Sequence, residues 1–206
     1  MKQPFAFLLT ILLLGAGAQA GGRPPQAGAA TEYADVDEHA NEHVSIAADP
    51  FDSEDSTHFF RLDYLKYDLL PVRIIVTNTG DRPINMADVR IQFISAANDR
   101  IPAATPDEID RRMNNVSNPM DHYHLPIPLP KGKTHNQKID QDMNDFGFNA
   151  LVVEPHTTQA GFLLYDVSGL DKPVLHGAAI YVKMIHDADG KDLFPFTISF
   201  DKLPGK

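Results

Sequence analysis

Three short stretches of the chain carry side chains whose types and spacing could do chemistry. The first, "HANEH", places His39, Glu42 and His43 in the order H-x-x-E-H, which is typical of one class of zinc peptidase. That chemistry needs both histidines and the glutamate on a rigid helix, with a third zinc ligand from elsewhere in the chain. The neighbours Asp35 and Asp37 supply no apolar stripe that would hold a helix. The sequence therefore predicts a solvated tail here and no catalysis.

The second stretch, "MDHYH", is the stronger candidate for a metal site. Alternate residues of an extended segment point to the same side, so His122 and His124 could bind one ion. Met120 or His135 would complete a copper or zinc site. The alternative is a polar loop whose histidines face water, because no fourth ligand is specified. Met120, His122 and His124 are the candidate metal ligands of this chain.

The third stretch, "DADGKD", places Asp187, Asp189 and Asp192 around Gly190, which resembles part of a calcium-binding loop. A complete loop needs a bidentate glutamate at its twelfth position, and no glutamate follows this stretch in the chain. Asp-Gly is a favoured reversal between two strands. The sequence therefore favours a hairpin turn over a calcium site.

Other enzymatic chemistry finds little support in the sequence. There is no G-x-S-x-G nucleophile elbow, His156 stands in a turn-like stretch, and no glycine-rich phosphate loop is present. Paired carboxylates of the glycosidase type stay open, because their separation in space cannot be read from the sequence. We expect a protein that is not an enzyme and has no cofactor, with a carboxylate-dependent hydrolase as one alternative.

The first twenty residues have the pattern of a signal peptide. Lys2 precedes an apolar run over residues 5–14, and Ala18-Gln19-Ala20 matches the small-x-small pattern before a cleavage site. Ten apolar residues are too few to span a bilayer, which takes about twenty in a helix. We expect a cleaved signal peptide over residues 1–20 and export to the periplasm or the extracellular space. An uncleaved membrane anchor is the alternative.

Composition limits the partners and the sources of stability. The formal net charge is −10, and it becomes −11 once Lys2 leaves with the signal peptide. A chain with this much negative charge is repelled by nucleic acid and by anionic membrane surfaces. Neither is therefore an expected partner. Cysteine is absent, so disulfides and thiolate metal sites are excluded. The remaining length predicts one domain.

The elements that must position these side chains are mostly strands. Residues 21–43 are rich in Gly, Pro and Ala and show no apolar period, which predicts a flexible linker ahead of a domain over residues 44–206. Period-two alternation predicts strands over 70–77 and 89–93, and their short link suggests antiparallel neighbours. Further strands are expected near 44–47, ahead of residue 154, at 162–167, and in a hairpin over 178–200. Because Pro195 lacks an N–H, the last strand should lie at a sheet edge, or its proline should face away from the ladder.

One short helix is well marked by its first residues. Thr105 precedes Pro106 and stands three residues before Glu108, which predicts an N-cap, a proline at the first helical position and a capping box. This helix is expected over 106–114, and a weaker one over 137–146 with Ile139, Met143 and Phe146 on one face. About seven antiparallel strands with one or two short inserted helices predict an all-β, immunoglobulin-like sandwich. A closed barrel is the structural alternative.

A family resemblance supports the same fold. The segments "LPVRIIVTNTGDRPI", "RIQFISAANDRIPAATPDEIDRR", "VEPHTTQAGFLLYDVSGL" and "DADGKDLFPFTISFDK" resemble an uncharacterised family of exported bacterial proteins with a predicted immunoglobulin-like domain. The resemblance covers roughly residues 48–203 and implies the fold and location without supplying any site residue. We expect an interaction or structural module of the cell envelope that binds another envelope protein or a surface ligand. A periplasmic copper- or zinc-binding protein using the histidine-rich loop is the main alternative.

Overall fold

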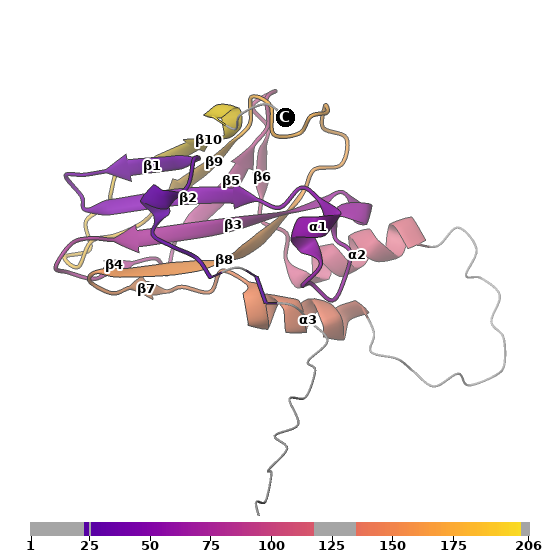
Figure 1. Ribbon diagram of the computed structural model, residues 1–206, viewed down its shortest axis with the longest axis horizontal. Helices are drawn as coiled ribbons and strands as arrows, with labels where there is room; N and C mark the ends of the chain where they lie inside the picture. The colour runs from indigo at the N-terminus through magenta and orange to yellow at the C-terminus, as the bar shows by residue number, and fades with distance from the viewer. Residues whose placement is uncertain (1–22, 25, 118–134, 203–206) are drawn as a thin grey trace, which may run out of the picture.

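The computed structural model describes residues 23, 24, 26–117 and 135–202, and this part of the chain is mostly β (Figure 1). Its strands form two four-stranded sheets, ordered β1-β2-β3-β8 and β10-β9-β5-β6, and a two-stranded pair of β4 with β7. Every pairing between named strands is antiparallel. The prediction of an all-β chain with antiparallel sheets is confirmed.

The ten strands of the described residues are β1 (Val36–His39), β2 (Val44–Pro50), β3 (Leu69–Asn78), β4 (Ile84–Asn85), β5 (Arg90–Ile94), β6 (Arg100–Pro102), β7 (Val152–Val153), β8 (Thr157–Asp166), β9 (Ala179–Lys183) and β10 (Phe196–Ser199). The helices are η1 (Ala30–Glu32), α1 (Glu54–Thr57), η2 (Leu65–Tyr67), α2 (Pro106–Ser117), α3 (His135–Phe146) and η3 (Phe200–Lys202), of which the η elements are 3-10 helices. The strands that the sequence did not predict, β1, β4 and β6, are only two to four residues long.

The two larger sheets pack face to face over an apolar core. Period two on β3 turns Leu70, Val72, Ile74 and Val76 toward the opposite sheet, where all four are buried. The opposite sheet contributes the buried side chains Phe93, Ile180, Val182, Phe196 and Ile198. Burying alternate side chains between two sheets is what holds such strands together without disulfides.

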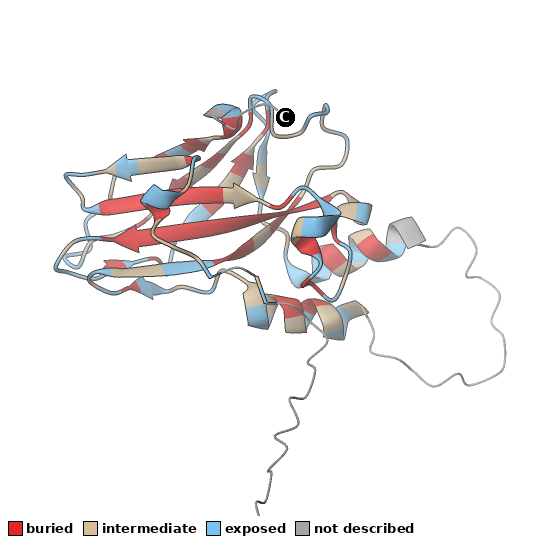
Figure 2. Ribbon diagram, viewed as in Figure 1, coloured by how far each residue is buried: buried red, intermediate tan, exposed pale blue. Residues whose placement is uncertain are grey.

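Strand β3 is buried on both of its faces, as Figure 2 shows along its length. A second cluster covers the outer face at one end of the sheet, where α1, α2 and α3 gather (Figure 1). This cluster joins Phe162 and Leu164 of β8 to Phe59, Ile109 and Ile139 from the covering segments. The helices are therefore a third layer of the domain that gives the first sheet a second core.

The helix α2 begins where its sequence predicts. Glu108 Oε2 accepts hydrogen bonds of 2.8 Å from the backbone N–H and from the hydroxyl of Thr105. The Glu108 N–H lies 3.4 Å from Thr105 Oγ1, which completes the reciprocal capping box. These bonds also hold the pKa of Glu108 below its ordinary value. The capping box and the helix start at Pro106 are confirmed.

The prediction of a flexible linker over residues 21–43 is wrong for residues 30–43. Strand β1 pairs with β2 in the register Val36↔Ala47 to His39↔Val44. Ahead of β1, Ala30 is fully buried and packs against Ala47 and Ile75. The Ala30 N–H donates a hydrogen bond of 2.8 Å to Thr77 Oγ1. This segment is ordered by small buried side chains and by hydrogen bonds of its backbone. It therefore forms without the periodic apolar pattern from which strands and helices are predicted.

The prediction that the strands over 70–77 and 89–93 are neighbours is also wrong. β3 lies between β2 and β8, whereas β5 lies between β6 and β9 in the other sheet. The link between them contains β4, which pairs with β7, so the chain leaves the first sheet before β5 begins. The β9–β10 hairpin is confirmed, and β10 lies at a sheet edge as Pro195 predicts. Among the described residues, no helix is both long and apolar enough to cross a bilayer.

Candidate functional site

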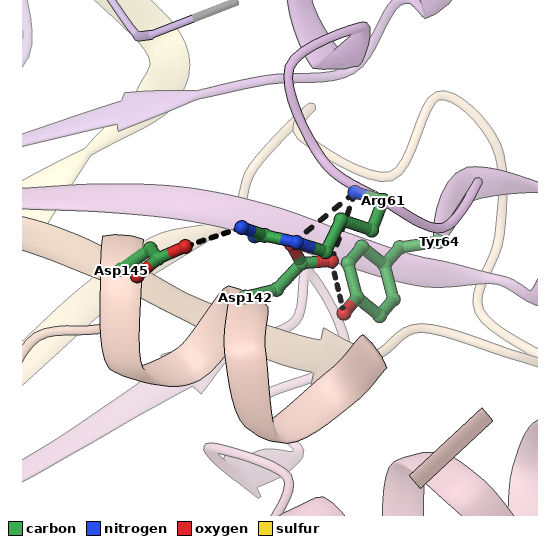
Figure 3. Close-up of polar contacts among 4 residues, drawn as sticks. All are labelled: Arg61, Tyr64, Asp142 and Asp145. Carbon is green, nitrogen blue, oxygen red and sulfur yellow. Dashed lines mark hydrogen bonds and ion pairs between the residues drawn. The ribbon is translucent and has the colours of Figure 1, made fainter. Parts of the chain in front are cut away.

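A buried polar cluster surrounds Asp142 on α3 (Figure 3). The Asp142 side chain is fully buried. Its Oδ1 accepts a bond of 2.8 Å from Arg61 Nη1 and its Oδ2 one of 2.9 Å from the Tyr64 hydroxyl. The backbone N–H of Arg61 lies 3.2 and 3.0 Å from the two carboxylate oxygens. Arg61 Nη2 also reaches Asp145 Oδ2, one turn along α3, at 2.5 Å.

Helical periodicity explains why a carboxylate lies in the core here. Ile139, Met143 and Phe146 form the apolar stripe of α3, and Asp142 lies within that stripe at i+3 from Ile139. Sequence reasoning identified the stripe and missed the acid within it. An acidic residue inside an apolar stripe is a usable signal, because a charge at such a position must find partners.

The electrostatics of the cluster follow from its burial. Desolvation raises the pKa of Asp142 above its ordinary value, and the hydrogen bonds from Arg61 and Tyr64 oppose that rise. Burial and the nearby Asp142 carboxylate raise the pKa of Tyr64. The hydrogen bonds to Asp142 and Asp145 raise the pKa of Arg61. Tyr64 is thus a hydrogen-bond donor at neutral pH and Arg61 a permanent cation.

This geometry suits a structural tie better than proton transfer. A general base needs a lone pair aimed at a reacting group, whereas both oxygens of Asp142 accept from protein donors on one segment. The segment with Arg61 and Tyr64 is thereby fixed to α3. The guanidinium also lies 5.8 Å from the ring centre of Phe146, which adds a cation–π contact to the tie.

An open hollow of about 240 Å³ lies beside this cluster. Its walls are Glu54, Thr57, His58, Phe60, Arg61, Leu62 and Asp63. The Thr57 hydroxyl hydrogen-bonds to the Ser53 carbonyl at 3.2 Å, and His58 Nδ1 lies 2.6 Å from the Asp55 carbonyl. The polar groups of these two walls are thus engaged by the local backbone.

The H-x-x-E-H stretch forms a β-hairpin. His39 ends β1, Glu42 lies in the turn, and His43 has a positive φ of 57° before β2 begins. The two histidines therefore do not share a helical face, which the peptidase chemistry requires. The prediction of a solvated tail is wrong as well: His39 Nδ1 lies 2.8 Å from Glu42 Oε2, and its ring stacks on Phe196 at 3.9 Å between centroids.

The "DADGKD" stretch forms the turn that the sequence favours, with Gly190 at φ 82°. Asp187 Oδ1 accepts from the N–H groups of Asp189 and Lys191. Asp189 forms a two-pronged ion pair with Arg82 at 2.6 and 2.7 Å, and Asp192 lies 3.0 Å from His186 Nε2. Each carboxylate thus has its own partner. Within residues 23–117 and 135–202, as far as they are described, no group of three or more His, Cys, Asp or Glu could hold a metal ion.

The candidate metal ligands Met120, His122 and His124 lie outside the described residues. His135, considered as a further ligand, is the first residue of α3. Copper or zinc binding by this loop stays a prediction. The signal peptide over residues 1–20 also lies outside the part of the chain that the structure describes.

A short ladder of four chain segments lies toward the end of the sandwich opposite the helices (Figure 1). Val152 of β7 pairs with Asn85 of β4, Asn85 with His186, and His186 with Asp192. Directly paired residues of antiparallel segments point to the same face, so these four side chains form one row. At strand spacings of about 4.8 Å, the row spans roughly 14 Å. We call it the end ladder.

The end ladder and its flanks carry all the large hydrophobic side chains that are exposed among the described residues. Leu151 is 66% exposed, Val152 43% and Phe194 71%. Val152 belongs to the row, Leu151 precedes it, and Phe194 lies two residues beyond Asp192 at the other flank. The buried face of the same segments, with Val153, Ile84 and Ile185, belongs to the inter-sheet core. A rigid base thus presents these side chains to solvent.

No model of a known protein family, no curated protein and no solved structure matches this chain.

Proposed function

We propose that the protein is an exported, non-enzymatic interaction module of the bacterial cell envelope, with an immunoglobulin-like sandwich that binds a partner protein through its end ladder. The observation that carries this proposal is that Leu151, Val152 and Phe194, the exposed large hydrophobic side chains of the described residues, lie at the two flanks of the end ladder. Exposed apolar side chains on a well-packed base, surrounded by polar residues, are typical of protein–protein contacts.

The polar groups of the cluster on α3 and of the H-x-x-E-H hairpin support binding over catalysis. Asp142 accepts from Arg61 and Tyr64, and Glu42 accepts from His39 and from the backbone of Phe194. Both carboxylates hold segments of the fold together. The polar groups around the end ladder, by contrast, surround side chains that remain in water.

Charge narrows the class of partner. The turns beside the end ladder contain Asp187, Asp189 and Asp192 against Arg82 and Lys191. Arg82 is already paired with Asp189, so the local surface is acidic like the chain as a whole. A partner with a basic rim around an apolar contact fits this surface, because opposite charges speed encounter and suppress wrong pairings.

Site-specific photo-crosslinking tests the proposal. A photoreactive phenylalanine analogue at position 194 should capture one defined partner in cells of the source organism. The same analogue in place of Asp140, which is exposed on α3, is the matched control and should not capture that partner. Adding Leu151→Ser should weaken capture from position 194 while leaving the thermal midpoint unchanged. Identical adducts from both positions would contradict a role for the end ladder.

A further inference from the structure

The exposed edge of β10 is covered by side chains instead of by a neighbouring strand. Asp37 Oδ2 of β1 accepts a hydrogen bond of 2.8 Å from the N–H of Thr197. Glu42 Oε1 accepts one of 3.0 Å from the N–H of Phe194. Between these two positions stands Pro195, which has no N–H to donate. One outward donor of β10 and one donor just ahead of the strand are thus bound by carboxylates, and Pro195 in the same segment has no donor.

The direction of these groups follows from the ladder with β9. Phe196 pairs with Val182 and Ile198 with Ile180. Backbone N–H groups alternate between the two sides of a strand, so the Thr197 N–H points away from β9. It points toward β1, the neighbouring edge of the other sheet, and Asp37 meets it there.

The β8 edge of the first sheet is protected in a different way. The Phe162 carbonyl accepts from the Phe148 N–H at 3.0 Å, and the Leu164 carbonyl from the Ala104 N–H at 2.8 Å. Gly161 permits this close approach, because a Cβ there would lie 2.5 Å from the Cα of Phe148. Backbone covers β8, whereas only the hairpin of residues 36–43 covers β10.

His39 holds that hairpin in place. Its ring stacks on Phe196 of β10 with 15° between the ring planes, and its Nδ1 is hydrogen-bonded to Glu42 Oε2 at 2.8 Å. Glu42 therefore contacts the hairpin with one oxygen and, with the other, Phe194 in the segment that leads into β10. His39 and Glu42 of the H-x-x-E-H stretch thus act together at the sheet edge.

We propose that the H-x-x-E-H hairpin is an edge guard, in which Asp37 and Glu42 take the place of strand carbonyls and keep β10 from pairing with β10 of a second copy. An unprotected edge strand presents N–H and C=O groups that pair readily with another chain. Two β10 strands running antiparallel about Thr197 would form a two-fold symmetric, eight-stranded sheet. The two carboxylates block that pairing by occupying the donors and by placing negative charge along the edge.

The test is self-association of the purified full chain, measured by sedimentation velocity over a hundredfold range of concentration. Asp37→Ala with Glu42→Ala should shift the protein from monomer to a concentration-dependent dimer. Amide exchange at Phe194 and Thr197, measured at low concentration, should speed up roughly tenfold or more, since each loses a bond to a charged acceptor. Glu38→Ala, on the opposite face of the same strand, removes one carboxylate as a control and should remain monomeric.

Two further variants separate edge pairing from simple unfolding. Asp37→Asn with Glu42→Gln keeps an acceptor oxygen at each position and should stay closer to monomer than the alanine pair. Thr197→Lys, at an exposed side chain, places a guarding charge on the edge. It should restore the monomer to the alanine pair without restoring the two hydrogen bonds.

Two results would overturn the proposal. One is an alanine pair that keeps its native circular dichroism and stays monomeric over the whole concentration range. The other is a dimer that Thr197→Lys leaves intact, since association would then use another surface. If the alanine pair is unfolded, the single variants decide: unchanged amide exchange at Thr197 in Asp37→Ala and at Phe194 in Glu42→Ala means that the carboxylates do not guard the edge.

Discussion

The two apolar cores of this protein are built in different ways. The core between the sheets is mainly aliphatic and follows period two on β3, β9 and β10. The core beneath the helices is rich in aromatic rings, from Phe51 to Phe162, and borders the hydrogen-bonded Asp142. Neighbouring strands are held together by backbone hydrogen bonds, whereas the helices are joined to the strands by loops. The comparison indicates that the core beneath the helices is fixed partly by a buried polar cluster, whereas the core between the sheets is held mainly by apolar packing and strand ladders.

Ring geometry sharpens the contrast. In the helical layer, Phe59 meets Phe51 and Phe146 edge to face, with centroids 5.9 and 5.2 Å apart. Phe60 meets Tyr64 in the same way at 5.3 Å. Such directional contacts, each worth about 0.5–1.5 kcal/mol beyond area burial, define one arrangement of the covering segments. Between the sheets, Phe93 and Tyr165 make a tilted contact among aliphatic neighbours.

The largest expected effect comes from breaking the core between the sheets. Phe93→Ala removes a ring with no exposed surface and should lower the free energy of unfolding by about 4 kcal/mol. Phe146→Ala, at a half-buried ring of the helical layer, should cost about half as much because solvent fills part of the space. Urea unfolding of both variants measures the difference. Equal losses would remove the distinction between the two cores.

The next effect concerns the polar tie of the helical layer. Asp142→Ala removes the acceptor of Arg61 and Tyr64 and should cost about 2–3 kcal/mol, because both donors lose a charged partner. Asp145→Ala removes a carboxylate that is 49% exposed and should cost less than about 1 kcal/mol. Asp145→Ala is the control, because it also replaces one aspartate of α3 by alanine and removes one negative charge. Similar values for the two variants would show that Asp142 is not a tie.

Much of this fold was predictable from local patterns. Alternation located β3 and β5, the Thr105–Glu108 capping box located the start of α2, and the Asp-Gly turn located the β9–β10 hairpin. Each of these signals acts over a few residues. They do not specify which strands become neighbours, so β3 and β5 were wrongly paired.

The candidate site was harder to predict because its contacts are distant in sequence. Asp142 meets Arg61 and Tyr64 across about eighty residues, and Asp37 meets Thr197 across twice that separation. Strand β1 was not predicted because "VDEH" contains one apolar residue. Its order comes from backbone pairing with β2 and from the Asp37 carboxylate, which accepts from the Thr197 N–H of β10. Such long-range polar contacts leave no periodic trace.

A smaller effect should appear in the pH dependence of stability. Burial raises the folded-state pKa of Asp142 above its ordinary value of 3.8, so the folded chain holds its proton to higher pH than the unfolded chain does. Stability from this group is then fully present below pH 3.8 and is lost as pH rises through the folded pKa.

Asp142→Asn removes this titration and isolates its contribution. The unfolding free energy of the wild type, minus that of the variant, should fall as pH rises from about 4, by about 1.4 kcal/mol for each pH unit of the shift. A difference that rises with pH would mean that the hydrogen bonds from Arg61 and Tyr64 outweigh burial.

The most direct test of the contrast between the two cores uses the same small change in each of them. Tyr165 and Tyr64 are both fully buried, but the Tyr165 hydroxyl has no hydrogen-bond partner among the described residues, whereas the Tyr64 hydroxyl donates to Asp142. Chemical denaturation of Tyr64→Phe should show a loss of about 1–2 kcal/mol, and Tyr165→Phe should be neutral or stabilising by up to about 1 kcal/mol. Equal losses in the two variants would contradict the claim that the core beneath the helices depends on a hydrogen-bonded hydroxyl that the core between the sheets lacks.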